Sequence, residues 1–134
     1  MTVGKINHLA VIVAAVVYYA WGALWFTVWG NQWQAYAGVT PGHVTATPFI
    51  VSFLMGLVLA YVIGIALADS TKPNMLQHGV SFGVFMSVGI WLTQLLSVEL
   101  YEQKPLGLWL IDGFYVVIGM AIMGAIIGAW RKRA

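Results

Sequence analysis

The sequence contains no cysteine and very little charge. Six Lys and Arg residues and four Asp and Glu residues make up 7% of its 134 residues, and the formal net charge is +2. Without cysteine, disulfides, thiolate metal sites and cysteine nucleophiles are excluded. Six cationic side chains are too few to form a nucleic-acid-binding surface, so no nucleic-acid partner is predicted.

The low content of charged residues is matched by a high content of apolar residues. They make up 61% of the chain, whereas a soluble domain is typically about half apolar and a quarter charged. The implied solvent is therefore the lipid bilayer. A spanning helix needs roughly 20 apolar residues, and four such helices use nearly the whole chain. We predict an all-α integral membrane protein, a four-helix transmembrane bundle that forms a single domain over residues 1–134.

The four predicted spans cover residues 9–29, 48–68, 79–97 and 106–130. The first is too long and too rich in Trp for the apolar region of a signal peptide, so we expect it to be retained. Residues 30–47 are rich in Gly, Thr and Pro, and they also hold Trp33 and Tyr36, side chains that suit the headgroup layer. Part of this connection is expected to lie along the membrane interface.

The distribution of Lys and Arg predicts the orientation of the bundle, because these residues are enriched in cytoplasmic loops. With the N-terminus inside, only Lys104 falls outside. The cytoplasmic side then holds Lys5, Lys72, Arg131, Lys132 and Arg133. We therefore expect a multi-pass protein of the bacterial inner membrane with both termini in the cytoplasm.

Small residues recur at helical spacing on three of the predicted spans. Such stripes let helix backbones approach closely, and close approach drives helix association in lipid. The stripe residues are Gly56, Ala60 and Gly64 on the second span, Gly79 and Gly83 on the third, and Gly124 and Gly128 on the fourth. The fourth span carries Asp112 and Tyr115 on its other face. It is either central in its own bundle or in contact with a second copy, which is the basis for predicting a homo-oligomer.

Asp112 is the only charged residue inside a predicted span, about six residues from the start of the fourth. Charge at such a position is costly and often functional. The carboxyl group either binds and releases a proton or cation, or acts as a cap or polar lock near the helix N-terminus. Glu99, Glu102 and Lys104 are expected to be solvated in the preceding loop.

A candidate polar pocket surrounds Asp112 in this interpretation. Gln94 shares a helix face with Gly79 and Gly83, so it is predicted to reach Asp112 as a substrate contact or a structural lock. The first span has an aromatic face, which is either a groove or a packing seam. The candidate pocket residues are Asp112, Tyr115, Gln94, Trp91, Trp25 and Tyr18.

No catalytic or cofactor motif is present, so the chain is predicted not to be an enzyme and to carry no cofactor or metal. His8 and His78 precede spans on the same side and are interpreted as polar caps rather than haem or metal ligands, and His43 lies in the opposite loop. The main hypothesis is a non-enzymatic subunit of a homo-oligomer or of a membrane-protein complex. The alternative is a small transporter or channel with a pocket around Asp112, and a membrane enzyme has least support.

Several motifs resemble a known family. They are Asn7 before an apolar helix, Gly22-Ala23-Leu24-Trp25, Trp33, Ser52-Phe53, Glu102 with Pro105, the run Leu110-Ile111-Asp112-Gly113-Phe114-Tyr115, and the run Met123-Gly124-Ala125-Ile126-Ile127-Gly128-Ala129-Trp130. The chain resembles the small bacterial four-helix membrane proteins known as domain of unknown function 1761. The resemblance spans almost the whole chain and implies a single four-helix membrane domain, without an assigned activity.

Overall fold

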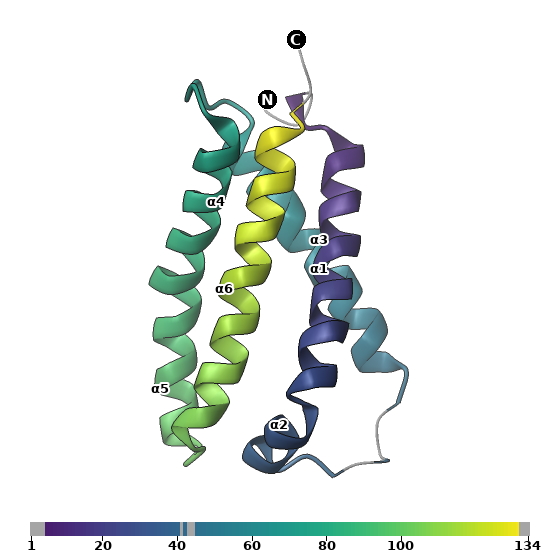
Figure 1. The fold of residues 1–134 in the computed structure, drawn as a ribbon, viewed down its shortest axis with the longest axis vertical. Coiled ribbons are helices and arrows are strands. Elements are labelled where there is room, and N and C mark those ends of the chain that lie inside the picture. The colour runs from purple at the N-terminus through teal and green to yellow at the C-terminus, as the bar shows by residue number, and fades with distance from the viewer. Residues whose placement is uncertain (1–4, 41, 43–44, 132–134) are drawn as a thin grey trace.

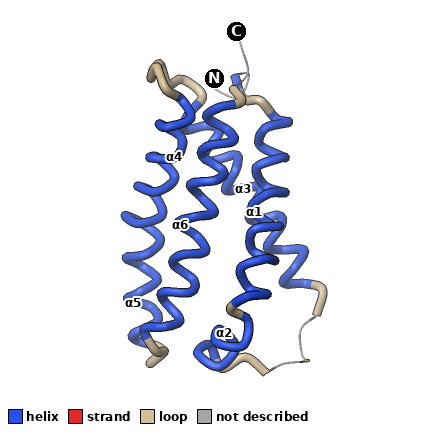
Figure 2. The backbone as a smooth tube through the Cα atoms, viewed as in Figure 1, coloured by secondary structure: helices blue, strands red, loops and turns tan. Residues whose placement is uncertain are grey.

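The structure is a computed structural model that describes residues 5–40, 42 and 45–131. Within these residues every regular element is a helix (Figure 2). The elements are α1 (His8–Val28), α2 (Gly30–Ala37), α3 (Thr47–Leu67), α4 (Met75–Met86), the π-helical segment η2 (Ser87–Leu92), α5 (Thr93–Tyr101) and α6 (Leu106–Ala129). Because α4, η2 and α5 follow one another without a break, they form one long helix.

Four helices in the described residues are long and apolar enough to cross a membrane, which confirms the predicted all-α class. Three of them lie within one residue of the predicted bounds. The third runs Met75–Tyr101, where residues 79–97 were predicted. Its start is fixed by Asn74, whose side chain accepts a hydrogen bond from the Gln77 backbone N–H, as Asn7 does for Ala10 at the start of α1.

α6 is the central helix of the bundle (Figure 1). In its most apolar stretch 44% of the residues are buried, against 17% in the α4–η2–α5 helix. The start of α1 and the end of α6 lie at one end of the bundle, which we call the terminal end, and α2 lies at the other, which we call the α2 end (Figure 1). The two faces of α6 that the sequence marked as packing surfaces are therefore both used within the chain, chiefly against α4 and α1.

The glycines of α4 and α6 bring these two helices into backbone contact. A Cβ atom on Gly79 would overlap the carbonyl oxygen of Gly124, and one on Gly124 would overlap that of Gly79. Gly83 meets the Met120 carbonyl in the same way, and Gly128 meets that of Met75. The Gly79, Gly83, Gly124 and Gly128 stripes are thus buried inside one chain. They give no support to the contact between copies that was predicted from them.

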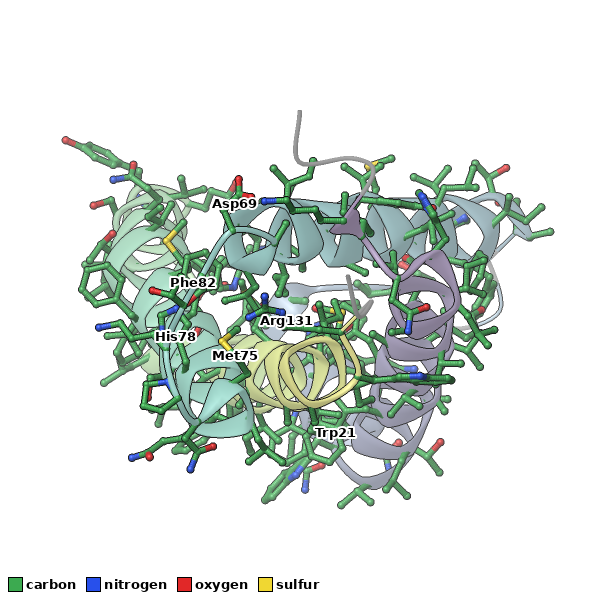
Figure 3. The ribbon with its side chains drawn as sticks, turned by 90° about the horizontal axis from the view of Figure 1, so that it is seen from above. Trp21, Asp69, Met75, His78, Phe82 and Arg131 are labelled. Carbon is green, nitrogen blue, oxygen red and sulfur yellow. The ribbon has the colours of Figure 1, made fainter. Side chains whose placement is uncertain are left out.

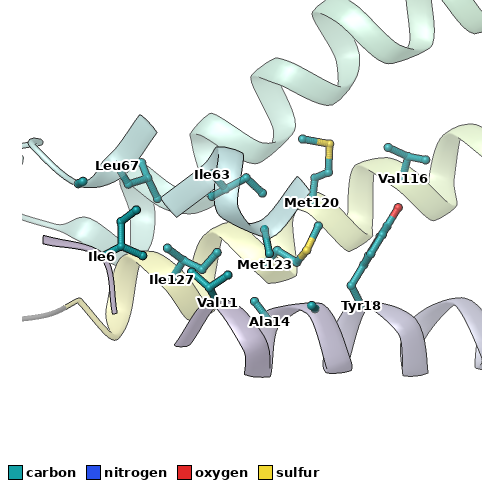
Figure 4. Close-up of a cluster of buried hydrophobic side chains, with 13 residues drawn as sticks. Ile6, Val11, Ala14, Tyr18, Ile63, Leu67, Val116, Met120, Met123 and Ile127 are labelled. Atoms are coloured by element: carbon teal, nitrogen blue, oxygen red, sulfur yellow. The ribbon is translucent and has the colours of Figure 1, made fainter. Parts of the chain in front are cut away.

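The second-span stripe is also used within the chain. Gly64 faces Val11 of α1, with 3.2 Å between its ideal Cβ position and Val11 Cγ2, and Gly56 faces the ring of Tyr18 at 3.3 Å. Ala60 between them is fully buried. These contacts between α1 and α3 make up one side of the main apolar core, which α6 completes with Val116, Met120, Met123 and Ile127 (Figure 4).

The core occupies the terminal half of the bundle. Its members nearest the α2 end are Tyr18 on α1 and Val116 on α6. Polar contacts close the terminal end, where Lys5 forms an ion pair with Asp69 at 2.7 Å and Asn7 donates to the Trp130 carbonyl. Arg131 extends from the end of α6 toward the loop after α3 and donates to the Ser70 carbonyl at 2.9 Å (Figure 3).

Large apolar side chains cover the outside of the bundle. On α3, for example, Phe49, Ile50 and Met55 are each more than half exposed, and on α4 Phe85 is 74% exposed. A soluble monomer rarely presents apolar surface on this scale. Exposed apolar faces on helices of spanning length are expected where the solvent is lipid.

Candidate functional site

The short helix α2 is held against α6 and the loop before it by three contacts. Trp33 Nε1 donates to Asp112 Oδ1 at 3.0 Å. The Tyr36 ring covers Gly107, where a Cβ atom would lie 2.6 Å from it. Lys104 Nζ donates to the Ala37 carbonyl at 2.9 Å, at the C-terminal end of α2, where a positive charge also interacts favourably with the helix dipole. The connection after α1 therefore includes an ordered helix bound to α6 and its preceding loop.

Two further indole groups join α1 to α6. Trp21 Nε1 donates to the Tyr115 carbonyl and Trp25 Nε1 to the Ile111 carbonyl, each at 3.0 Å. The two donors are four residues apart on α1, and the two acceptors are four residues apart on α6. Antiparallel helices can therefore form both bonds at the same time. In lipid an unpaired indole N–H has no water to bond, and each such bond contributes about 0.5–1.5 kcal/mol.

Glu99 was expected in a solvated loop, and this expectation is wrong. It lies inside α5 and is 5% exposed, while neighbouring Glu102 is exposed. Its Oε2 atom has no hydrogen-bond partner in the described part of the chain. A buried carboxyl oxygen without a partner is uncommon in proteins, and such an atom points to a functional role or to a bound proton, ion or water.

The π-helical segment η2 explains why Glu99 faces the bundle. At about 100° per residue, Glu99 would lie about 120° from buried Ser87 in an unbroken α-helix. A π-helical turn acts as one inserted residue and reduces this angle to roughly 20°. The Ser87 and Thr93 hydroxyls bracket η2 and donate to the carbonyls of residues three and four positions earlier, which satisfies backbone groups near the irregular turn.

The same rotation turns Gln94 away from α6. In an unbroken helix Gln94 would lie about 20° from Ser87, but the extra residue moves it to about 120°. Gln94 is exposed and Trp91 is 44% exposed. The predicted contact from Gln94 to Asp112 is therefore absent from the described residues, and neither Gln94 nor Trp91 belongs to this site. The partner of Asp112 is Trp33 instead.

Glu99 and Asp112 meet from two antiparallel helices. Side chains lean toward the N-terminus of their own helix, so Glu99 leans toward the membrane centre and Asp112 leans toward the α2 end. The two carboxyl groups lie close enough to share a hydrogen bond when one of them carries a proton. Asp112 is half-buried, so the pair lies within the bundle.

The predicted aromatic face of α1 is divided between the core and a pocket. Tyr18 is buried and stacks on Tyr115, with the ring centroids 5.3 Å apart. Phe26 meets the same Tyr115 ring edge-on at 5.0 Å. Trp25 bonds α6, as described above. Tyr18 and Trp25 are therefore packing residues, whereas Tyr115 reaches the pocket with part of its ring.

A pocket of about 770 Å³ lies between α1, α2 and the first turns of α3. Tyr19, Phe26, Trp33, Phe49 and Tyr115 provide aromatic walls, and hydroxyl and amide groups come from Thr27, Gln34, Thr45 and Ser52. The pocket opens at the surface, since lining residues such as Tyr19 and Phe49 are exposed. Asp112 does not line it but contacts it through Trp33.

The histidines and charges show no grouping suited to a metal ion. No group of three or more His, Asp or Glu side chains is close enough to hold one among the described residues. His8 Nδ1 lies 2.9 Å from the Tyr61 hydroxyl, which links α1 to α3. His43, Lys132 and Arg133 lie outside the described residues.

The fold and the site define a multi-pass helical membrane protein whose α2 end carries a carboxyl pair beside an aromatic pocket. The family model described as "Protein of unknown function (DUF1761)" matches residues 9–128, so the chain belongs to that family. The match covers all four spans, and the activity of the family is unknown. No curated protein sequence and no solved structure matches the chain.

Proposed function

We propose that this protein is a non-enzymatic protein of the bacterial inner membrane that binds a small, uncharged amphipathic molecule in the pocket at its α2 end. This proposal keeps the ligand-binding step of the transporter hypothesis. It places the binding site in the pocket beside Asp112 instead of at Asp112 itself. The observation that carries the proposal is the 770 Å³ pocket with aromatic walls.

The pocket's size and chemistry support a ligand of this class. Ligand sites usually enclose about 300–1,000 Å³, with apolar and aromatic walls and a few polar groups that orient the ligand. None of the described lining residues is charged, so a charged ligand would find no counter-ion among them. The hydroxyl groups of Thr45 and Ser52 suit a hydroxyl or carbonyl on a mainly apolar molecule.

The pocket's place in the bundle also favours a ligand that enters from the membrane. The terminal half is packed at glycine contact distances, whereas α1 and α3 enclose the pocket near the α2 end. Exposed Phe49 lies at its edge, and an amphipathic molecule in the bilayer would meet this opening directly.

The orientation remains part of the proposal. Among the described residues Lys5, Lys72 and Arg131 lie at the terminal end and Lys104 at the α2 end. The positive-inside rule then favours cytoplasmic termini and a pocket that opens toward the outer leaflet. Assembly into a homo-oligomer or a larger complex stays a prediction, since the glycine stripes are buried within the chain.

Photo-crosslinking tests the binding proposal. The full chain in lipid nanodiscs is irradiated with a long-chain alcohol that carries a diazirine, and the labelled residues are mapped by mass spectrometry. Label should concentrate on Phe26, Phe49 and their neighbours. Ser52→Trp fills the pocket from α3 and should reduce this labelling several-fold.

Val51→Trp provides the matched control, because Val51 is exposed on α3 beside Ser52 but does not line the pocket. It should label as the wild type does. An anionic fatty-acid analogue of the same length should label the pocket less than the alcohol. Labelling spread evenly over the apolar surface, or equal in both Trp variants, would contradict the proposal.

A further inference from the structure

The Glu99–Asp112 pair has the surroundings of a site that holds a proton. Glu99 is 5% exposed, its Oε2 lacks a partner among the described residues, and its carboxyl group lies within hydrogen-bonding reach of that of Asp112. Two adjacent negative charges removed from water repel strongly, and one proton between them relieves that repulsion. A hydrogen ion fits this site better than a metal ion, since no group of three or more His, Asp or Glu side chains among the described residues is close enough to hold a metal ion.

No nearby cation substitutes for that proton in the described structure. The other groups that face the pair are Glu102 just after α5, Tyr115 on α6 and the Trp33 indole on α2. Glu102 adds negative charge and the other two are neutral. Lys104, which follows α5, donates to the Ala37 carbonyl.

The pair is also connected to the short helix α2. Asp112 Oδ1 accepts the Trp33 hydrogen bond that helps to hold α2 on the bundle, and Trp33 lines the pocket. α2 has no buried residue of its own, so its position depends on a few contacts. A change of charge at the pair therefore acts on the contact that seats α2.

We propose that Glu99 and Asp112 form a proton-binding site that holds one proton between them at neutral pH and thereby keeps α2 seated on the bundle. When the pH rises and the proton leaves, the second negative charge drives the carboxyl groups apart and loosens α2. The inference does not depend on what the pocket binds, because it concerns the bundle without a ligand.

Infrared spectroscopy of the full chain in lipid vesicles tests the proton directly. Wild-type protein at neutral pH should show the carbonyl stretch of one protonated carboxyl group, and the band should disappear toward alkaline pH. Glu99→Gln should abolish the band, since Asp112 alone keeps its Trp33 donor and access to water. Asp112→Asn should leave Glu99 without the neighbouring negative charge that favours its protonated form, and so move the loss of the band to lower pH.

Glu102→Gln is the matched control, because it removes an exposed carboxyl group directly after α5 and should leave the band at neutral pH in place. The coupling to α2 is measured as tryptophan fluorescence, which should change together with the band and lose that change in Trp33→Phe. A wild-type spectrum without a protonated carboxyl group at neutral pH, or a band that survives Glu99→Gln, overturns the proton site. A band that titrates without a change in Trp33 fluorescence overturns the coupling.

Discussion

Adding a single methyl group to Gly124 should destabilise the protein, because there is no space for it. The new Cβ atom would overlap the carbonyl oxygen of Gly79 on α4. This neighbour is backbone, which cannot rotate aside as a side chain can, so α4 and α6 must separate. Overpacking of this kind costs about 1–3 kcal/mol, and a contact with backbone belongs in the upper half of that range.

The opposing effect of the Gly124→Ala change is smaller. Ala favours a helix over Gly by about 1 kcal/mol, so the net loss in free energy of unfolding should be roughly 1–2 kcal/mol. The measurement is an unfolding titration with sodium dodecyl sulfate in mixed micelles, followed by circular dichroism. Because the contact lies within one chain, the loss should not depend on protein concentration.

Ala substitutions at two other glycines provide the comparison for this experiment. Gly89→Ala should cost nothing measurable, since no atom lies within 4 Å of its ideal Cβ position. Gly64→Ala should fall between the two, because its neighbour at 3.2 Å is the Val11 side chain, which can shift. If Gly124→Ala were as stable as the wild type, or if Gly89→Ala were equally harmful, the close approach of α4 and α6 would be refuted. A loss that varied with protein concentration would place the contact between copies instead.

Three further predictions concern the ends of the bundle. Periplasm-dependent reporters fused after Gly42 and after Gln103 should give signal and a fusion after Asn74 should not, whereas the reverse pattern would invert the orientation. Asp112→Asn should keep the hydrogen bond from Trp33 and have near-wild-type stability at neutral pH. Asp112→Leu should lower the free energy of unfolding by about 1–3 kcal/mol, because it leaves the Trp33 N–H unpaired, and the same unfolding titration measures both variants. Asn74→Ala should lower the free energy of unfolding by about 1 kcal/mol by removing a helix cap, and Thr71→Ala serves as its control.

The sequence predicted the spans well because length and apolarity alone decide what can cross a bilayer. It also predicted that the small residues of α4 and α6 mediate close packing, although it could not decide whether the partner was the same chain or a second copy. A helical stripe of Gly at four-residue spacing has the same pattern in both cases. Only the three-dimensional contact between Gly79 and Gly124 distinguishes them.

Only one of the two residues of the carboxyl site could be identified from the sequence. Asp112 stood out because it interrupts an apolar run, but Glu99 is followed closely by Glu102 and Lys104, a pattern typical of a loop. The burial of Glu99 depends on the π-helical turn, and no local pattern of apolar residues predicts that turn. The assumption of constant helical periodicity assigned Gln94 to the α6 face and missed Glu99. Trp33 was interpreted as a headgroup anchor. Its hydrogen bond to Asp112 joins residues 79 positions apart and depends on where α2 folds, which the sequence pattern does not indicate.

The indole bonds from α1 to α6 have a consequence for how the two helices are aligned. Trp21 and Trp25 bind main-chain carbonyls, and an α-helix presents equivalent carbonyls on the same face at every turn. If α6 slid by one turn, about 5.4 Å, the same two indoles would find acceptors again, so they fix the spacing and rotation of the pair but not its vertical alignment. That alignment is set where side-chain size matters, at Gly119 beneath the Tyr18 ring. Together with the stacking of Tyr18 on Tyr115, this contact allows a single vertical alignment of α1 and α6 among those that the indole bonds alone would permit.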